Sequence, residues 1–220
     1  MPIGESQFVK LTQKRIANTS IGASTVRGRA PGTARSATHY LEALNLQPFA
    51  ATETNFRRAL NRATNALCKR LPEDSWGHAR KFLNIFLRGA NYDRFLCEAY
   101  DFRRAEPWLE VPLDSNVAKS LLKAAKGRAA LPRWRGIKYL DPQTSELYQD
   151  FALEVAEAKG VKRVHLDLIY WRSSPPKIAG GHEASNRQLS SASGTALRGS
   201  GGRGRRRCSC RTRAPRRSGG

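Results

Sequence analysis

The chain has 220 residues, of which 39 are Lys or Arg and 18 are Asp or Glu, so its formal net charge at pH 7 is +21. No stretch approaches the roughly 18 consecutive apolar residues that a membrane-spanning helix needs, so we expect no membrane partner. A large excess of positive charge favours a polyanionic partner. Cations that neutralise phosphates release the counterions bound there, and this release increases affinity for nucleic acid.

Three segments differ in composition. Residues 1–32 hold one acid, Glu5, among basic and hydroxyl residues, which predicts a basic N-terminal arm or an organelle transit peptide. Residues 33–172 carry helical patterns and predict one helical domain. Residues 173–220 hold eleven of the basic residues and one of the acids in a Gly, Ser and Ala background, which predicts a disordered basic tail or a non-native stretch read out of frame. Without that tail the net charge is still about +11.

Cysteine usage gives no sign of a disulfide framework or of a metal site. Cys68 and Cys97 lie in helical patterns, and Cys208 and Cys210 lie in the tail without a second ligand pair at zinc-binding spacing. We therefore expect no metal, no cofactor and a reducing interior, either cytoplasmic or nucleoid-associated.

Residues 53–71 contain the clearest helical pattern. The apolar stripe at helical spacing consists of Phe56, Leu60, Ala63, Leu67 and Leu71. The opposite face carries Arg58, Arg62 and Lys69, which are candidates for phosphate contacts. Pro72 lacks the N–H that a continuing helix requires and predicts the end of this one.

A second helix is expected after Asp74 and Ser75, residue types that commonly cap helix N-termini. Its broad apolar face predicts a central position in the bundle. Lys81 and Arg88 lie on its polar edge and are further candidates for phosphate contacts. The aromatic-rich residues 91–102 are expected to pack in the core rather than to stack on bases.

Residues 106–112 are bracketed by prolines, so we expect them to cross the surface in extended form. Asp114 or Ser115 then caps another helix, whose outer row consists of Lys119, Lys123 and Lys126. A charged outer face is normal in any soluble helix. The absence of acids from both cationic rows nevertheless favours a surface that follows phosphates.

Residues 131–138 are expected to form a loop in which Trp134 lies between Arg133 and Arg135. This pattern suits phosphate contacts combined with stacking on an unpaired base. It suits equally a tryptophan that fills the end of the bundle.

The next helix has clear boundary signals in Asp141, Pro142 and Gly160. Its outer face is acidic and consists of Glu146, Asp150, Glu154 and Glu157. Phosphate would be repelled by these carboxylates, so we expect this face to point away from nucleic acid.

Residues 161–171 fit both a helix and an alternating strand. Because every other element is helical and no partner strand is evident, we favour a short terminal helix. The expected fold is therefore all-α, a compact helical bundle-like single domain with disordered basic termini.

Catalytic signals are sparse, since the chain has no phosphate-binding glycine loop and no nucleophile elbow. His165 and Asp167 are the weak candidates for catalysis, since a packed or surface histidine and a helix-capping or ion-paired aspartate are the commoner roles. Gly160 and Val161 followed by these two residues resemble the end of a helix-hairpin-helix DNA glycosylase, over fewer than ten residues. The resemblance implies that Asp167 stabilises a sugar cation. The usual glycine-rich hairpin is matched only loosely by residues 131–137, where its residue types are spaced more widely. The resemblance does not assign the chain to this family.

The leading hypothesis is a nucleic-acid-binding protein, largely indifferent to sequence, that contacts DNA or RNA through basic helix faces and its Arg-rich tail. The alternative is an enzyme acting on nucleic acid, either glycosylase-like or a nuclease, with Asp167 and His165 at its site. A scaffold that meets acidic proteins or ribosomal RNA is a third reading. The sequence leaves open whether any reaction is catalysed, and it leaves the oligomeric state open too.

Overall fold

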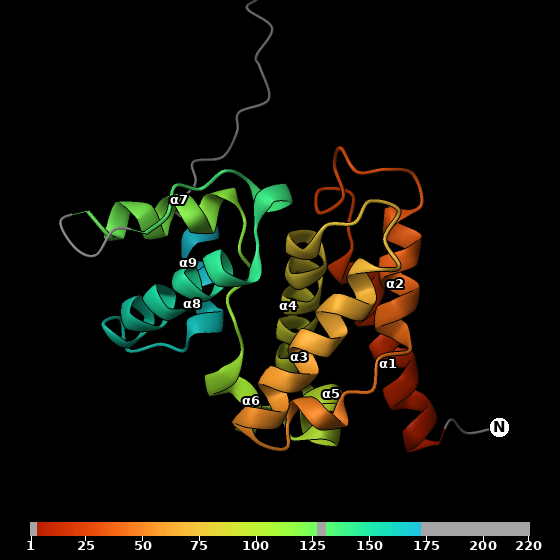
Figure 1. Cartoon of the computed structure of the whole chain (residues 1–220). Coiled ribbons are helices and arrows are strands. Elements are labelled where there is room, and N and C mark those ends of the chain that lie inside the picture. The colour runs from red at the N-terminus through yellow and green to blue at the C-terminus, as the bar shows by residue number, and fades with distance from the viewer. Residues whose placement is uncertain (1–3, 127–130, 173–220) are drawn as a thin grey trace, which may run out of the picture. The chain divides into compact units, whose positions relative to one another are not determined.

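The computed structural model describes residues 4–126 and 131–172, and every regular element within these ranges is a helix (Figure 1). The all-α prediction is confirmed, including the helical choice for the last apolar stretch. The α-helices are α1 (Glu5–Ser20), α2 (Thr33–Glu42), α3 (Glu53–Cys68), α4 (Trp76–Tyr92), α5 (Arg94–Tyr100), α6 (Phe102–Ala105), α7 (Ser115–Ala124), α8 (Pro142–Glu157) and α9 (Leu166–Arg172). Short 3-10 turns are η1 (Gln47–Phe49), η2 (Glu106–Trp108), η3 (Ile137–Tyr139) and η4 (Arg163–His165).

The first core cluster is built from α1 to α6. Phe56 and Leu60 of α3 pack with Phe82 and Phe86 of α4, and each of these side chains is at most 1% exposed. Burial of one such side chain contributes about 1.5–3 kcal/mol. α4 contacts α1, α2 and α3, which confirms its expected central place.

A second core cluster is built from α7, α8 and α9. Val117 and Leu121 of α7 pack with Tyr148 and Ala152 of α8 and with Leu166 of α9. Each of these side chains is at most 1% exposed. Both clusters lie within one compact unit that contains all the described residues.

Residues 5–20 do not form the expected N-terminal arm, because α1 is part of the first core cluster. Ala17 is fully buried, and the Gln13 amide donates hydrogen bonds to the carbonyl oxygens of Leu41, Glu42 and Leu44 at 3.0, 3.3 and 2.8 Å. Leu41 and Glu42 are the last two residues of α2, and Leu44 follows that helix, so Gln13 helps to satisfy the carbonyl groups at its C-terminal end. The helical domain therefore begins before residue 33, whereas the tail at 173–220 lies outside the described residues.

The segment after α6 also differs from expectation. Residues 106–108 form the turn η2, and the extended chain that follows is buried rather than exposed, since Leu109, Val111 and Leu113 are 1%, 0% and 2% exposed. Leu109 belongs to the first core cluster and Val111 to the second. The segment between the two prolines is therefore buried and connects the first core cluster to the second.

Most helix boundaries follow the capping signals. Asp114 accepts hydrogen bonds from the backbone N–H groups of Asn116 and Val117, and Asp141 accepts one from that of Thr144. Gly160 adopts a left-handed conformation at φ 66° just after α8. α3 ends earlier than expected, at Cys68, because the chain turns before Pro72. Within the described residues, no helix has the length and apolar character needed to cross a membrane.

Candidate nucleic-acid interface and polar cleft

The loop between α7 and α8 is held against the first turn of α4. η3 contacts α4, and Leu140 is only 5% exposed. Gly77 permits this close approach, because a Cβ there would overlap the Ile137 carbonyl oxygen and would lie 2.8 Å from the Leu140 Cβ. The Tyr148 hydroxyl fixes the loop from the other side by donating a hydrogen bond of 2.7 Å to the Pro132 carbonyl.

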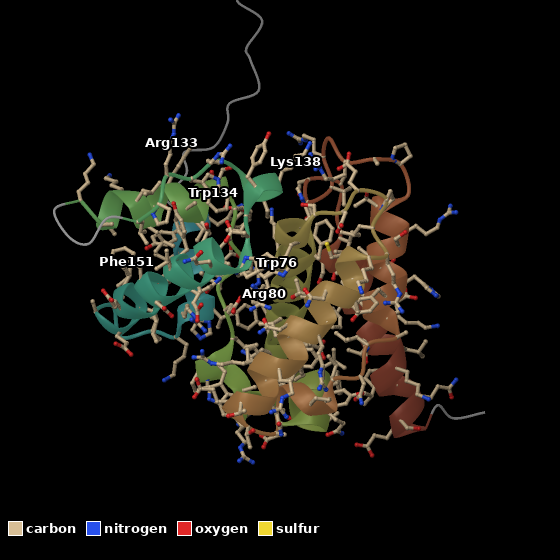
Figure 2. The ribbon with its side chains drawn as sticks, in the orientation of Figure 1. Trp76, Arg80, Arg133, Trp134, Lys138 and Phe151 are labelled. Atoms are coloured by element: carbon tan, nitrogen blue, oxygen red, sulfur yellow. The ribbon has the colours of Figure 1, made fainter. Side chains whose placement is uncertain are left out.

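This loop exposes an aromatic ring and three cations. Tyr139 is 59% exposed, and the guanidinium carbon of Arg135 lies 5.1 Å from its ring centroid. Arg133 and Lys138 are exposed too, and Figure 2 shows Arg133 directed away from the ribbon. Within the described part of the chain, no carboxylate pairs with Arg133, Arg135 or Lys138. We call these three cations and Tyr139 the loop surface.

Trp134 has the packing role that the sequence left open. Its ring centroid lies 5.5 Å from that of Tyr148 in an edge-on arrangement, and its Nε1 donates to the Ser115 hydroxyl at 3.4 Å. The ring is therefore turned toward α7 and α8. The exposed aromatic of the loop is Tyr139, which sequence reasoning missed because it weighed only the ring flanked by two arginines.

Cations from three segments surround His78 in the same turn of α4. Burial, together with the positive charges of Arg29, Lys81 and Lys138, lowers the pKa of His78 to about 4. The Ser75 hydroxyl lies 2.7 Å from its Nδ1. His78 is therefore neutral at pH 7, and its surroundings are electropositive next to the loop surface.

The two predicted helical rows are exposed but lie on helices of different core clusters. α3 carries Arg58 and Arg62, with Lys69 directly after its end, and α7 carries Lys119 and Lys123, with Lys126 two residues after its end. All six cations are exposed. Arg58 and Arg62 border a groove of about 700 Å³ whose lining includes Phe49 and Ala59. The α7 row belongs to the helix whose first residue, Ser115, contacts the loop through Trp134. The structure therefore brings α7 and the loop together, while the α3 row borders a separate groove.

Lys81 and Arg88 do not fit the role predicted for them. Lys81 lies 3.9 Å from the Asp114 carboxylate with 17% of its side chain exposed, and burial lowers its pKa. Arg88 is ion-paired with Asp167, and 21% of each side chain is exposed. Both cations are committed within the fold, because α4 is the central helix and its polar edge faces neighbouring elements rather than solvent.

The two candidates for catalysis are also held by partners. Asp167 is the ion-pair partner of Arg88. The Nδ1 of His165 lies 2.8 Å from the Tyr92 hydroxyl, and its Nε2 lies 3.3 Å from a carboxylate oxygen of Glu106. These contacts connect η4 and α9 to α4 and η2, so each residue has a structural role in joining the clusters.

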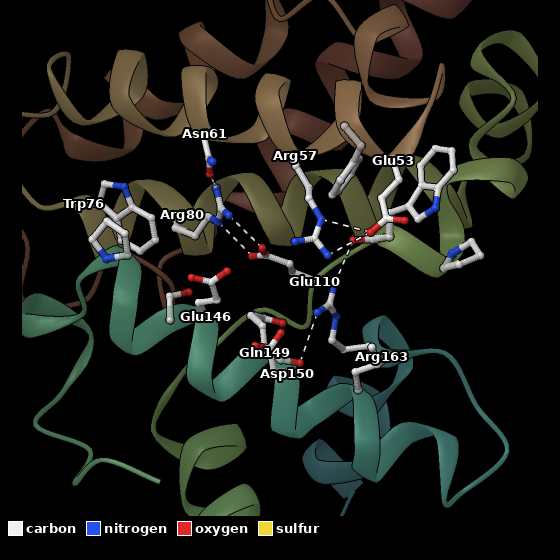
Figure 3. A pocket seen from close by; sticks show the side chains of 16 residues that line it. Glu53, Arg57, Asn61, Trp76, Arg80, Glu110, Glu146, Gln149, Asp150 and Arg163 are labelled. Atoms are coloured by element: carbon white, nitrogen blue, oxygen red, sulfur yellow. Dashed lines mark hydrogen bonds and ion pairs between the residues drawn. The ribbon is translucent and has the colours of Figure 1, made fainter.

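A polar cleft of about 190 Å³ lies between α8 and the helices α3 and α4 (Figure 3). Arg80 of α4 forms a two-pronged ion pair with Glu110, with N···O distances of 2.9 and 2.8 Å. The remaining Arg80 nitrogen donates to Asn61 at 2.9 Å and to Thr64 at 3.1 Å, and the Asn84 amide donates to Glu110 at 2.9 Å. The pair is only 10% and 13% exposed.

In the buried pair of Arg80 and Glu110, each charge is balanced by the other. Burial alone would raise the pKa of Glu110, but the attraction and hydrogen bonds of Arg80 outweigh burial and hold that pKa below its usual value. Arg163, which also lines the cleft, donates to the carbonyl oxygens of Leu109, Gln149 and Trp108 at 3.3, 3.2 and 3.0 Å. No nitrogen of Arg80 is left to bind a ligand, and Arg163 is fixed by backbone.

One buried polar group of the cleft lacks a partner. Ser145 is 3% exposed, and its hydroxyl forms no hydrogen bond to the described residues. Gln149, one turn later on α8, uses its amide fully by accepting from the Val111 N–H at 3.1 Å and donating to the Val111 carbonyl at 2.8 Å. No sequence signal distinguished Ser145, because a serine in the first turn of a helix is ordinary.

Comparison of this chain with protein-family models, with curated proteins and with solved structures finds no match. Functional conclusions therefore depend on the geometry above.

Proposed function

We propose that this protein binds nucleic acid largely without regard to sequence, through the loop surface, the adjacent α7 lysines and its Arg-rich tail. The observation that carries the proposal is the loop surface itself. It presents an exposed tyrosine with a guanidinium against its ring, beside two further cations that no carboxylate of the described residues neutralises.

Each part of the loop surface suits a different part of a nucleotide. Exposed Arg and Lys side chains contact phosphates, and an exposed aromatic ring stacks on an unpaired base with little dependence on its identity. Close packing of the loop on Gly77 supports binding, because a fixed platform loses little conformational freedom when a strand docks. These features favour single-stranded DNA or RNA over a duplex.

The test compares two triple substitutions of equal charge. Replacement of Arg133, Arg135 and Lys138 by Gln should reduce the slope of log K against log salt by about 2 units for a single strand, because each phosphate contact contributes about 0.7. The control replaces Lys10, Lys14 and Arg15, exposed cations of α1, by Gln. Fluorescence anisotropy across a salt series measures both. Equal slopes for the two variants would remove the loop surface from the proposal.

Stacking is tested separately at Tyr139. Tyr139→Ala should weaken binding of a dT oligonucleotide by about 1–3 kcal/mol, whereas Tyr139→Phe should bind like the parent protein, since the ring and not the hydroxyl stacks. Similar affinity for all three proteins would contradict a stacking role.

An enzyme acting on nucleic acid is the second candidate, and the contacts of His165 are the observation that favours it. A histidine held between a hydroxyl and a carboxylate has the arrangement of a general base with its orienting group. Damaged and undamaged oligonucleotides are incubated with the full chain, with and without magnesium. Product that forms with the parent protein and is lost in His165→Gln supports catalysis, and binding without product supports the binding protein.

A further inference from the structure

The polar cleft between α8 and the α3–α4 pair has the size of a small ring. Its volume of about 190 Å³ slightly exceeds the roughly 150 Å³ of an engineered cavity that accepts benzene. Trp76 and Trp108 line it, and Arg80 lies over the Trp76 ring with its guanidinium carbon 5.3 Å from the ring centroid. Arg80 therefore covers one face of Trp76, and the aromatic lining that remains for a planar guest is the rest of that ring and Trp108.

The charges of the cleft exclude phosphate as its ligand. Arg80 is paired with Glu110, and Arg57 is paired with Glu53 at 3.0 Å. Arg163 donates to three backbone carbonyls. The exposed carboxylates of Glu146 and Asp150, which come from the α8 side in Figure 3, form no ion pair with the described residues, although Asp150 attracts Arg163 and raises its pKa. These acceptors repel an anion and require a ligand that donates hydrogen bonds.

Ser145 supplies an independent sign of a missing ligand. Ser145 lines the cleft, and its hydroxyl is buried and has no partner among the described residues. An unsatisfied buried hydroxyl costs about 1–3 kcal/mol. Such a group is expected where a ligand or an ordered water completes the hydrogen bonds.

We propose that this cleft receives an unstacked base that carries an exocyclic amino group, with cytosine the best fit by size. The proposal rests on the proposed nucleic-acid binding and deepens it. The cytosine amino group donates to Asp150 or Glu146, its ring nitrogen or carbonyl accepts from Ser145, and its face packs on tryptophan. Thymine and uracil present a carbonyl oxygen where cytosine has its amino group, so the carboxylates repel them.

The test measures the preference of the full chain for dC12 over dT12 and over an abasic 12-mer by fluorescence anisotropy. The expected preference is at least about fivefold, the lower end of what one read or stacked base contributes. The variant Glu146→Gln with Asp150→Asn should lose that preference. Its matched control, Glu154→Gln with Glu157→Gln, changes the same charge on the same helix outside the cleft. The control should bind all strands more tightly and keep the preference.

Ser145→Ala gives a second readout that does not depend on charge. It should reduce the preference for dC12 severalfold while leaving the unfolding midpoint equal or higher, because the lost hydroxyl had no partner in the free protein. Lower stability in this variant would show that the hydroxyl is structural and would count against the proposal.

The failures of the two proposals are distinguishable. Equal, salt-dependent binding of all three strands by the parent protein overturns the base site and leaves nucleic-acid binding intact. If no strand binds, free cytidine is titrated while the tryptophan fluorescence of the chain is followed, and Trp76→Phe and Trp108→Phe show how much of the change comes from the cleft. If cytidine leaves the fluorescence unchanged, the base site is overturned. A parallel titration uses arginine amide as the probe, and quenching by arginine amide but not by cytidine overturns the base site in favour of a basic peptide ligand.

Discussion

At the scale of single residues, burial decides which charges are available. Arg80 and Arg133 are both arginines, yet the first is enclosed with Glu110 and the second is exposed without an acid. Taking a charge out of water is expensive unless it is paired and hydrogen-bonded, so Arg80 needs its complete set of acceptors. The availability of each cation thus follows from its immediate neighbours rather than from its type.

Removing one partner of the buried pair should be costly. Glu110→Gln should lower the free energy of unfolding by about 3–5 kcal/mol, because it leaves the Arg80 guanidinium buried without a counter-charge. Urea denaturation measures the change. The control Glu154→Gln alters an exposed acid and should stay within about 0.5 kcal/mol. A loss for Glu110→Gln no larger than the control's would show that water reaches the pair.

His78 should make the stability of the protein depend on pH. Its pKa in the fold is about 4, below the usual 6.5, so the unfolded chain binds the proton more readily between these values. The contribution is fully present above pH 6.5 and is lost as the pH falls toward 4, by about 2 kcal/mol at pH 5. Unfolding free energies at pH 7.5 and 5 measure it. His78→Gln should show a correspondingly smaller difference between the two pH values, and an unchanged difference would assign the effect to other groups.

At the scale of elements, the loop between α7 and α8 depends on the helix beneath it. η3 can lie on α4 because residue 77 has no side chain. This contact places Lys138 beside His78. The position of this cation of the loop surface therefore depends on the absence of a side chain at Gly77.

Gly77→Ala should therefore displace the loop. The added methyl group overlaps the Ile137 carbonyl oxygen, so the loop must shift, and both stability and oligonucleotide affinity should fall. The affinity should fall by about tenfold if one phosphate contact and the stacking platform are misplaced. Gly89→Ala on the same helix meets the Ile16 side chain at 2.9 Å rather than the loop. Gly89→Ala is a control for binding only. Its affinity should equal that of the parent protein, and equal losses of affinity in both variants would contradict a role of Gly77 in placing the loop.

At the scale of the whole molecule, charge is unevenly distributed along the chain. The residues after Lys177 hold ten Lys and Arg and one acid, whereas the outer face of α8 carries four carboxylates. Nonspecific affinity for a polyanion follows the number of cations that reach phosphates. The tail should accordingly raise affinity for every strand alike.

A chain that ends at Lys177 tests this contribution. It retains the compact unit that contains all the described helices. Its slope of log K against log salt should be smaller by several units, up to about 7 if all ten cations contact phosphates of a single strand, while its relative affinity for dC12 and dT12 should not change. An altered base preference would show that the tail takes part in selectivity.

Periodicity and caps were sufficient to predict the helices, because the apolar face of α4 and the aspartates before α7 and α8 act through local geometry. Patterns could not show that α1 packs on α2 or that residues 109–113 are buried, since both depend on contacts between distant segments. For the same reason Lys81, Arg88, His165 and Asp167 could not be identified as paired from sequence alone.

The sequence by itself determined the helical class of the fold and the large positive excess, because both are properties of residue types and their spacing. Only the tertiary structure decided which cations stay uncommitted, that Tyr139 and not Trp134 is the exposed ring, and that Ser145 lies unpartnered in a cleft. These outcomes depend on desolvation and on the partners that packing brings within hydrogen-bonding distance, and no pattern along the chain records them.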